Sequence, residues 1–145
     1  MMIRKAEAQD LPVLAELACR LWPDHTPAEM RAEYGEMMAK SDAACFLAYA
    51  DEAPVGFAQC QLRHDYVEGT DSAPVGYLEV IYVADGFRKQ GIAKALLAAC
   101  ESWAREQGCA EFASDCELQN TESLRFHLNV GFREANRIIC FTKEL

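Results

Sequence analysis

Residues 77–94 have the sequence YLEVIYVADGFRKQGIAK, and this stretch decides the fold. Its first seven residues are apolar apart from Glu79, and together with the two residues before them they predict a buried strand over 75–83. From 92 to 107 the chain has no Gly or Pro, and its apolar residues recur at helical spacing, which predicts a helix that ends at Gly108. The stretch is therefore a strand, a basic loop and the start of a helix.

The loop between this strand and this helix is suited to binding an anion. Backbone N–H groups are free at a helix N-terminus, where the helix dipole is positive. Gly91 lets the backbone approach a phosphate closely, and Arg88, Lys89 and Lys94 add positive charge. The Walker and dinucleotide patterns are both absent, because the first needs Gly-Lys-Ser/Thr and the second needs three spaced glycines. The alternative interpretation is a basic turn that only caps the helix.

Two ordered motifs resemble the GNAT family of N-acetyltransferases, which hold acetyl-coenzyme A. Arg88-x-x-Gly91-x-Ala93 resembles the pyrophosphate loop of that family, and the segment 120–132 resembles its Asn-x-x-Ala-x-x-x-Tyr-x-x-x-Gly-Phe signature, with Ser123 at the Ala position and His127 at the Tyr position. The resemblance implies acetyl-coenzyme A as co-substrate and no metal. It implies that the co-substrate is held by Ile81, Tyr82, Val83, Arg88, Lys89, Gln90, Gly91, Ile92, Ala93, Lys94, Asn120 and His127.

Periodicity and turn residues place the remaining elements. They predict strands over 2–6, 43–50, 55–63, 109–115 and 132–144, and helices over 8–21, 27–40, 91–107 and 120–130. The order β-α-α-β-β-β-α-β-α-β is the one that the resemblance implies. It corresponds to an α/β (α+β) GNAT fold with a mixed central sheet of about six to seven strands flanked by about four helices. We expect one domain over 1–145.

Composition excludes several classes of function. The 14 basic and 23 acidic residues give a net charge of −9, which argues against a nucleic-acid partner. No apolar run has the length of a membrane span, and no signal peptide is evident. The seven cysteines form no Cys-x-x-Cys pair, which is typical of reduced thiols in a cytoplasmic protein and argues against a zinc site or disulfides.

Two carboxylates are the strongest candidates for binding and deprotonating an amine. Glu79 is the sole charge in its predicted strand, so it must face water, an arginine or a cationic ligand. Asp115 ends the next predicted strand of the sheet, where ligands enter open sheets. An alkylammonium must lose a proton before it can attack a thioester, and a carboxylate can accept that proton. We therefore predict that Asp115 and Glu79 are catalytic.

Segments flanking these residues resemble the aminoglycoside 6′-N-acetyltransferases nearly from end to end. They include Leu21-Trp22-Pro23-x-His25, the stretch 63–72, and Ala113-Ser114-Asp115. The resemblance implies a homodimer and an aminoglycoside site lined by Trp22, His25, Tyr66, Glu79, Asp115 and position 136, where relatives place a Glu and this chain has Asn136. Polycationic sugars suit carboxylates and aromatic platforms. The expected reaction is acetyl transfer from acetyl-coenzyme A to the 6′-amine.

Several alternatives stay open at this stage. The acceptor could be a polyamine, a peptide or another cellular amine, and a binding module without turnover would carry the same cofactor motifs. We expect direct transfer in a ternary complex rather than an acyl-enzyme on Cys116, because no His-Asp pair is assigned to that thiol. The general acid is open, because His127 replaces the family's Tyr. The apolar segment 138–141 would be a liability as a free edge, which is consistent with pairing across subunits.

Overall fold

The computed structural model describes residues 1–145 and contains one five-stranded sheet with the order β1-β2-β3-β4-β5. Neighbouring strands from β1 to β4 are antiparallel, whereas β5 runs parallel to β4, so the sheet is mixed as expected. The strands are β1 (Met2–Lys5), β2 (Ala43–Ala50), β3 (Ala53–Arg63), β4 (Val75–Val83) and β5 (Phe112–Ser114).

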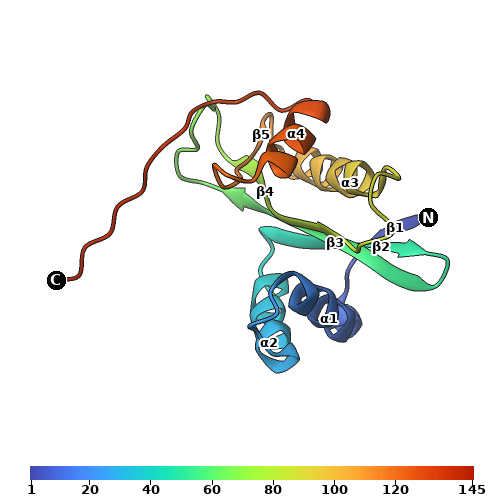
Figure 1. Ribbon diagram of the computed structural model, residues 1–145. Coiled ribbons are helices and arrows are strands. Elements are labelled where there is room, and N and C mark those ends of the chain that lie inside the picture. The colour runs from blue at the N-terminus through green and yellow to red at the C-terminus, as the bar shows by residue number, and fades with distance from the viewer.

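Four α-helices cover the two faces of the sheet in pairs (Figure 1). One face carries α1 (Leu11–Leu21) and α2 (Pro27–Met38), and a short 3₁₀ turn over Ala8–Asp10 precedes α1. The opposite face carries α3 (Ile92–Glu106) and α4 (Thr121–Asn129). None of these helices has the length and apolar character that crossing a bilayer requires. The predicted number of helices is confirmed.

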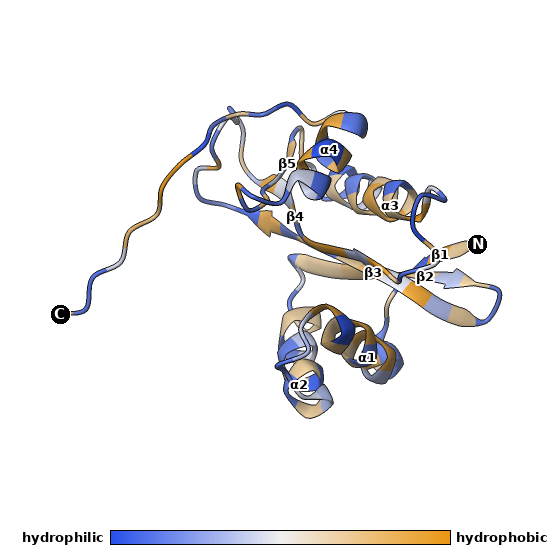
Figure 2. Ribbon diagram, in the orientation of Figure 1, coloured by the Kyte–Doolittle hydropathy of each residue, from blue (hydrophilic) through white to orange (hydrophobic).

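Each helix layer buries one apolar stripe against the sheet. In α3 the buried side chains include Leu96, Leu97, Cys100 and Trp103, a spacing that keeps them on one face of a helix. They pack in one cluster with side chains of β2, β3 and β4. A second cluster fills the space between α1, α2 and the other face, with Phe57 at 0% exposure in its centre. Figure 2 shows the apolar residues gathered along the central strands.

The prediction of a strand over 132–144 is wrong, and the sheet has five strands rather than six to seven. After α4 the chain leaves the body as an extended C-terminal arm, residues 133–145, all of which are exposed (Figure 1). The apolar pattern of this arm is suited to a strand, but a strand exists only when a neighbour pairs with its backbone. No segment of the same chain pairs with the arm, so it remains extended without ladder hydrogen bonds.

Smaller differences concern element ends. The strand predicted over 109–115 is reduced to the three residues of β5, because its parallel ladder to β4 covers only the pairs from Gly76–Phe112 to Leu78–Ser114. The helix predicted from residue 8 begins as a 3₁₀ turn and becomes α-helical at Leu11. The other predicted elements match within two residues.

An ion pair fastens β1 to the start of α1. The Asp10 carboxylate is 5% exposed and accepts hydrogen bonds from Arg4 Nη1 at 2.8 Å, Arg4 Nη2 at 2.7 Å and the Glu7 backbone N–H at 2.8 Å. The bonds from Arg4 hold the pKa of Asp10 below its usual value. A carboxyl whose folded pKa is lowered stabilises the protein above its unfolded pKa and loses that contribution as the pH falls through the folded value.

We therefore expect Arg4→Met to lower the free energy of unfolding by about 1–3 kcal/mol at neutral pH, because it leaves a buried carboxylate without its cation. Urea denaturation at several pH values measures the effect, and the deficit should shrink in strongly acidic buffer. Arg20→Met is the control, since Arg20 and Glu16 form an exposed i,i+4 pair that contributes little. A deficit that is equal at all pH values would contradict this role of Arg4.

Candidate active site

The central feature of the site is a fork between β4 and β5. Their parallel ladder ends at the pair Leu78–Ser114. Beyond this pair β4 continues to Val83, hydrogen-bonded on one side to β3, whereas the chain after Ser114 turns away toward α4. The edge of β4 over Glu79–Val83 that faces away from β3 therefore has no strand on it, and its backbone groups can bind a ligand. This stretch contains the predicted co-substrate residues Ile81, Tyr82 and Val83.

A β-bulge at Glu79 lies at the base of the fork. Gln59 pairs with Val80 and the next residue, Cys60, pairs with Leu78, so Glu79 is the extra residue without a partner on β3. A bulge changes the direction of a side chain and commonly lies beside a functional site. The bulge also explains how a charged residue is accommodated in an otherwise apolar central strand.

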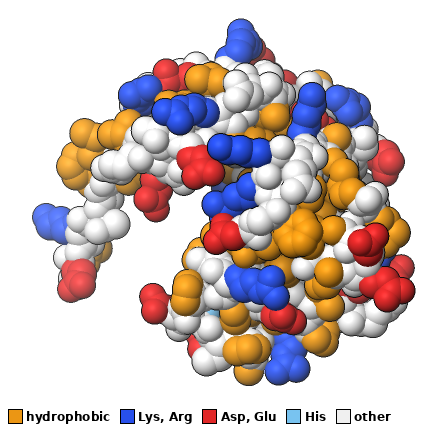
Figure 3. Space-filling model, turned by 45° about the vertical axis from the view of Figure 1, so that its right-hand side comes forward, with side chains coloured by type: hydrophobic (Ala, Val, Ile, Leu, Met, Phe, Trp, Pro, Cys, Tyr) orange, Lys and Arg blue, Asp and Glu red, His pale blue; other side chains and the backbone are white.

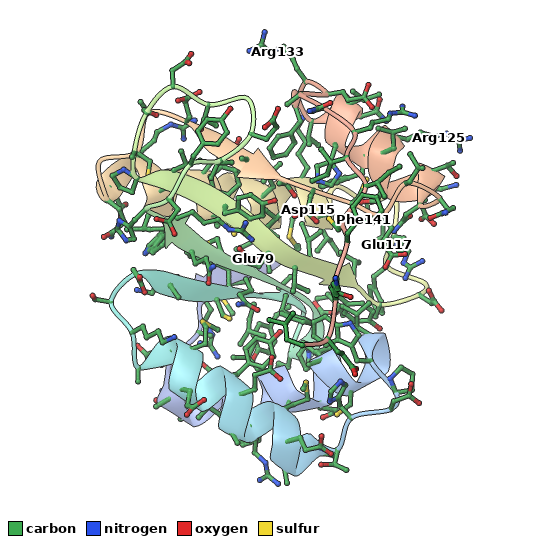
Figure 4. All side chains as sticks on the ribbon, turned by 90° about the vertical axis from the view of Figure 1, so that its left-hand side faces the viewer. Glu79, Asp115, Glu117, Arg125, Arg133 and Phe141 are labelled. Atoms are coloured by element: carbon green, nitrogen blue, oxygen red, sulfur yellow. The ribbon has the colours of Figure 1, made fainter.

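Both predicted catalytic carboxylates belong to one network of contacts, and Figure 4 shows them near each other beside the central strands. Glu79 Oε1 accepts from Arg63 Nη2 at 2.8 Å and from Arg63 Nε at 3.1 Å. The Arg63 guanidinium carbon lies 3.5 Å from the centre of the Tyr77 ring. The Tyr77 hydroxyl in turn donates to Asp115 Oδ2. The sequence left water, an arginine or a cationic ligand as the partner of Glu79, and in the structure the partner is an arginine, Arg63.

Tyr77 connects the two carboxylates and is itself buried. Burial, and next the hydrogen bond to Asp115, raise the pKa of the Tyr77 phenol above its usual value. The phenol therefore remains protonated at neutral pH and acts as a fixed hydrogen-bond donor. Sequence reasoning missed Tyr77 and Arg63. The alternation of side chains along a strand places residues 77 and 79 on one face and could have identified Tyr77, but nothing local indicated Arg63.

His127 connects α4 to the fork. Its Nδ1 lies 2.7 Å from the backbone carbonyl oxygen of Ser123, and its Nε2 lies 2.8 Å from Ser114 Oγ. A carbonyl oxygen can only accept, so Nδ1 carries a proton. In the neutral ring Nε2 then accepts from the Ser114 hydroxyl, and in the charged ring it donates to it. Ser114 Oγ is also 3.3 Å from the carbonyl oxygen of Leu78, which accepts its proton in the second case. Sequence reasoning missed Ser114.

The basic loop ends at Gly91, the N-cap of α3. Gly91 has φ 83°, a left-handed conformation that glycine adopts without strain, and Lys89 has φ 61°. Loop residues 88–91 are exposed, and the Arg88 side chain is fastened by its Nε to the carbonyl oxygen of Val83 at 3.0 Å. The loop thus joins the end of β4 to a helix N-terminus with cations around it, an arrangement that binds phosphate groups.

Asn120 has a structural role next to this site. It is the N-cap of α4, and its Oδ1 accepts from the Ser123 backbone N–H at 3.1 Å. The cap uses the side-chain oxygen and leaves the amide NH₂ available for another contact. The predicted binding of the co-substrate by Asn120 is therefore compatible with the cap but must use that NH₂ group.

The predicted drug-contacting residues outside the fork lie in two further regions. Trp22 packs against the core under α1 and α2, and exposed His25 forms an i,i+4 pair with Glu29 at 3.4 Å. In the loop between β3 and β4, Tyr66 is exposed, and its hydroxyl oxygen accepts from the Gly69 backbone N–H at 3.3 Å. Asn136 at the start of the arm donates to Glu68 at 3.1 Å, so the arm crosses the acidic loop 64–74 before it leaves the body. Their contacts do not connect any of these residues to the two carboxylates.

Comparison with protein families gives a match to the acetyltransferase (GNAT) family over residues 11–132. Among curated proteins, the aminoglycoside N(6′)-acetyltransferase type 1 of Serratia marcescens is 41% identical over 145 residues, covering 99% of both chains. The protein of the same name from Acinetobacter haemolyticus is 35% identical, and the match covers 100% of this chain and 99% of that protein.

Solved structures give the same result for the fold. The structure of AAC(6′)-Iy in complex with a bisubstrate analogue, CoA-S-monomethyl-acetylneamine, has a TM-score of 0.94 and 40% identity, with 99% of this chain and 98% of that chain covered. The apo structure of the 6′-N-acetyltransferase AAC(6′)-IG from Acinetobacter haemolyticus has a TM-score of 0.92 and 35% identity, over 100% and 99% of the two chains.

The contacts of His127 predict its tautomer. In the neutral ring, long-range ¹⁵N–¹H correlation spectra should show a protonated Nδ1 and an unprotonated Nε2. The chain has three histidines, and a His127→Gln variant identifies the signals of this ring. His25 and His64 are exposed and serve as internal references. A protonated Nε2 in the neutral ring would contradict the geometry.

Proposed function

The chain belongs to the acetyltransferase (GNAT) family, and on that premise we propose that it transfers the acetyl group of acetyl-coenzyme A to the 6′-amino group of aminoglycoside antibiotics. The observation that carries the proposal is the fork, which joins a basic anion-binding loop at one end to a pair of carboxylates at the other. Relatives with this activity in their names match almost the whole chain at 35–42% identity.

The residues of the loop fit an anionic co-substrate. Free N–H groups at the start of α3 and the side chains of Arg88, Lys89 and Lys94 suit a pyrophosphate. The unpaired edge of β4 over Ile81–Val83 suits the amide-containing arm of coenzyme A, because an extended chain can bond to an open strand edge. The thioester supplies the activated acetyl group, and the residues of the fork hold it beside the carboxylates.

The carboxylates act at the amine end. An aminoglycoside amine is mostly protonated at neutral pH, so it binds as an ammonium group and must lose a proton before it attacks. Asp115 is exposed and directly follows β5 at the mouth of the fork, which suits it to accept that proton directly or through water. Glu79 lies deeper, with a side chain that is 21% exposed, and suits the binding of a second cationic group.

Transfer in this proposal is direct, within a complex of the enzyme with both substrates. Cys116 is exposed and forms no hydrogen bond to a base, so no activated thiol competes with direct attack. The departing thiolate needs a proton. In the charged ring, His127 Nε2 donates to Ser114 Oγ, and the Ser114–His127 pair at the end of the β4–β5 ladder therefore suits the role of the general acid.

We propose that the protein is a homodimer in which the C-terminal arms are exchanged. The arm exposes Ile138, Ile139 and Phe141 at 72%, 80% and 87%, and Figure 2 shows this apolar stretch away from the body. The outer edge of β5 is also unpaired. A groove of about 270 Å³ beside β5 is lined by apolar side chains that include Phe112, Val130 and Phe132. An exposed apolar strand and an open sheet edge are complementary, and the arm of a second copy satisfies both.

Thiol release from acetyl-coenzyme A tests the proposed function. Kanamycin and tobramycin should give rapid release, and Asp115→Asn should lower kcat/KM by about 10²-fold or more, because loss of a general base typically costs that much. Glu117→Gln is the matched control, since Glu117 is an exposed carboxylate two residues further along. Double-reciprocal plots of the initial rate against one substrate, at several fixed concentrations of the other, should give intersecting lines, as expected when both substrates are bound together.

Two results would overturn parts of this proposal. Release with spermidine or a basic peptide, and not with the drugs, would move the function to a cellular amine. Parallel, ping-pong lines would contradict direct transfer and indicate a covalent intermediate.

Arm exchange predicts that association depends on the apolar side chains of the arm. The natural protein should be a dimer in light scattering at micromolar concentration, whereas an Ile139→Glu/Phe141→Glu double variant should be monomeric, because burying two charges at a strand pairing is costly. Thr142→Glu, on the opposite face of the same extended segment, should remain a dimer. A dimer that survives the double variant would place the interface elsewhere.

A further inference from the structure

Arg63 lies at the last position of β3 and holds the deeper carboxylate of the site. Its Nη2 is 2.8 Å from Glu79 Oε1 and 3.1 Å from Oε2, and its Nε is 3.1 Å from Oε1. Glu79 has no other cationic partner among the ion pairs of the protein. Because the Arg63 side chain is 38% exposed, it can leave toward solvent without opening the core.

Tyr77 is the platform on which the Arg63 guanidinium rests. The guanidinium carbon lies 3.5 Å from the ring centre, a contact in which a cation is attracted to the face of the ring. The hydroxyl of the same ring donates to Asp115. The position between the two carboxylates is thus occupied by a cation of the protein itself, bound by the carboxylate and the aromatic face that suit an ammonium group of a ligand.

We propose that Arg63 is an internal counter-ion that occupies the Glu79 position in the free protein and is displaced by an ammonium group of the substrate. The inference rests on the proposed function, because it takes a polycationic amine as the ligand. A ligand with one ammonium group uses Asp115 and leaves the Arg63–Glu79 pair intact. A ligand with several ammonium groups reaches Glu79 as well, and must first separate Arg63 from Glu79 and from Tyr77.

Arg63 therefore determines specificity by lowering the affinity for polycations. The charges of the site explain this effect: two carboxylates and one guanidinium leave one negative charge, so a polycation meets a weaker field than the carboxylates alone would produce. Removing the guanidinium leaves Glu79 available and removes the competition. The gain should be large for a ligand that reaches Glu79 and small for a ligand that does not.

Calorimetric binding of tobramycin and of glucosamine, which carries one amine, tests the proposal without requiring turnover. Arg63→Met should lower the Kd of tobramycin by about tenfold, the size expected when one partly exposed ion pair and one cation–π contact no longer compete. The Kd of glucosamine should change by less than about threefold. Arg125→Met is the matched control, because Arg125 is exposed on α4 and forms no ion pair, and it should change neither value.

A second variant tests whether Arg63 is displaced by the ligand or only holds Glu79 in position. In a Glu79→Gln background, Arg63→Met should no longer tighten tobramycin binding, because the competing pair is already absent. Weaker tobramycin binding by Arg63→Met, with a normal melting transition, would overturn the proposal and make Arg63 a positioning residue for Glu79. The melting transition also shows whether Arg63→Met is folded. If it is not, Arg63→Lys replaces it: this variant keeps the charge but loses the planar contact, and it should lower the Kd of tobramycin by a smaller factor than the roughly tenfold expected for Arg63→Met.

Turnover and binding together distinguish failure of the counter-ion role of Arg63 from failure of the proposed function. Turnover of aminoglycosides by the natural protein, with tobramycin binding unaffected by Arg63→Met, refutes the counter-ion role and leaves the proposed function intact. Absence of turnover, with the tenfold gain in tobramycin binding present, refutes the proposed function and leaves the counter-ion role intact.

Discussion

The end of the β4–β5 ladder at Leu78 and Ser114 is the constraint on which the site depends. If pairing continued, the backbone groups of β4 after the bulge would be satisfied by β5, and no open edge would exist for a ligand. The bulge at Glu79 serves the same end, because it places a charged side chain at the base of the fork without disturbing the apolar pattern of the strand on either side of it.

Basic and acidic residues are clustered in different segments of the chain, although the protein as a whole is acidic. The basic residues of the loop after β4 lie at the N-terminus of α3, whereas the segments 64–79 and 111–122 together hold eight acidic residues and no Lys or Arg. Glu122, at the end of the second segment, lies 4.0 Å from Arg88 of the loop. Figure 3 shows cationic and acidic side chains on a hollowed face between the helical layer and the C-terminal arm. In the proposed reaction, the basic loop would attract the anionic co-substrate and the carboxylates of the fork would attract the cationic amine.

The parts of this arrangement that the sequence predicts are those specified locally. The α3 helix with its start at Gly91, the apolar runs of β2 and β3, and the basic loop all follow from neighbouring residues. The positions of Glu79 and Asp115 at the centre and the end of predicted strands likewise identify them as candidates. The Glu79–Arg63 pair and the Tyr77–Asp115 bond join residues on different strands, so no local pattern indicates them. The prediction of a strand over 132–144 failed for a related reason: its apolar pattern is typical of a strand, but no strand of the same chain pairs with it.

The position of the arm at the C-terminus has a consequence for how the protein is made. During synthesis the five strands and four helices leave the ribosome first, and they can pack into the body before the arm is available. In the proposed dimer, arm exchange would then be a separate step between two bodies that are already folded, and its rate would rise with the square of their concentration. At low expression the newly made chains spend longer with a bare apolar arm, so the same segment that would join two copies is also the one most exposed to proteolysis and aggregation.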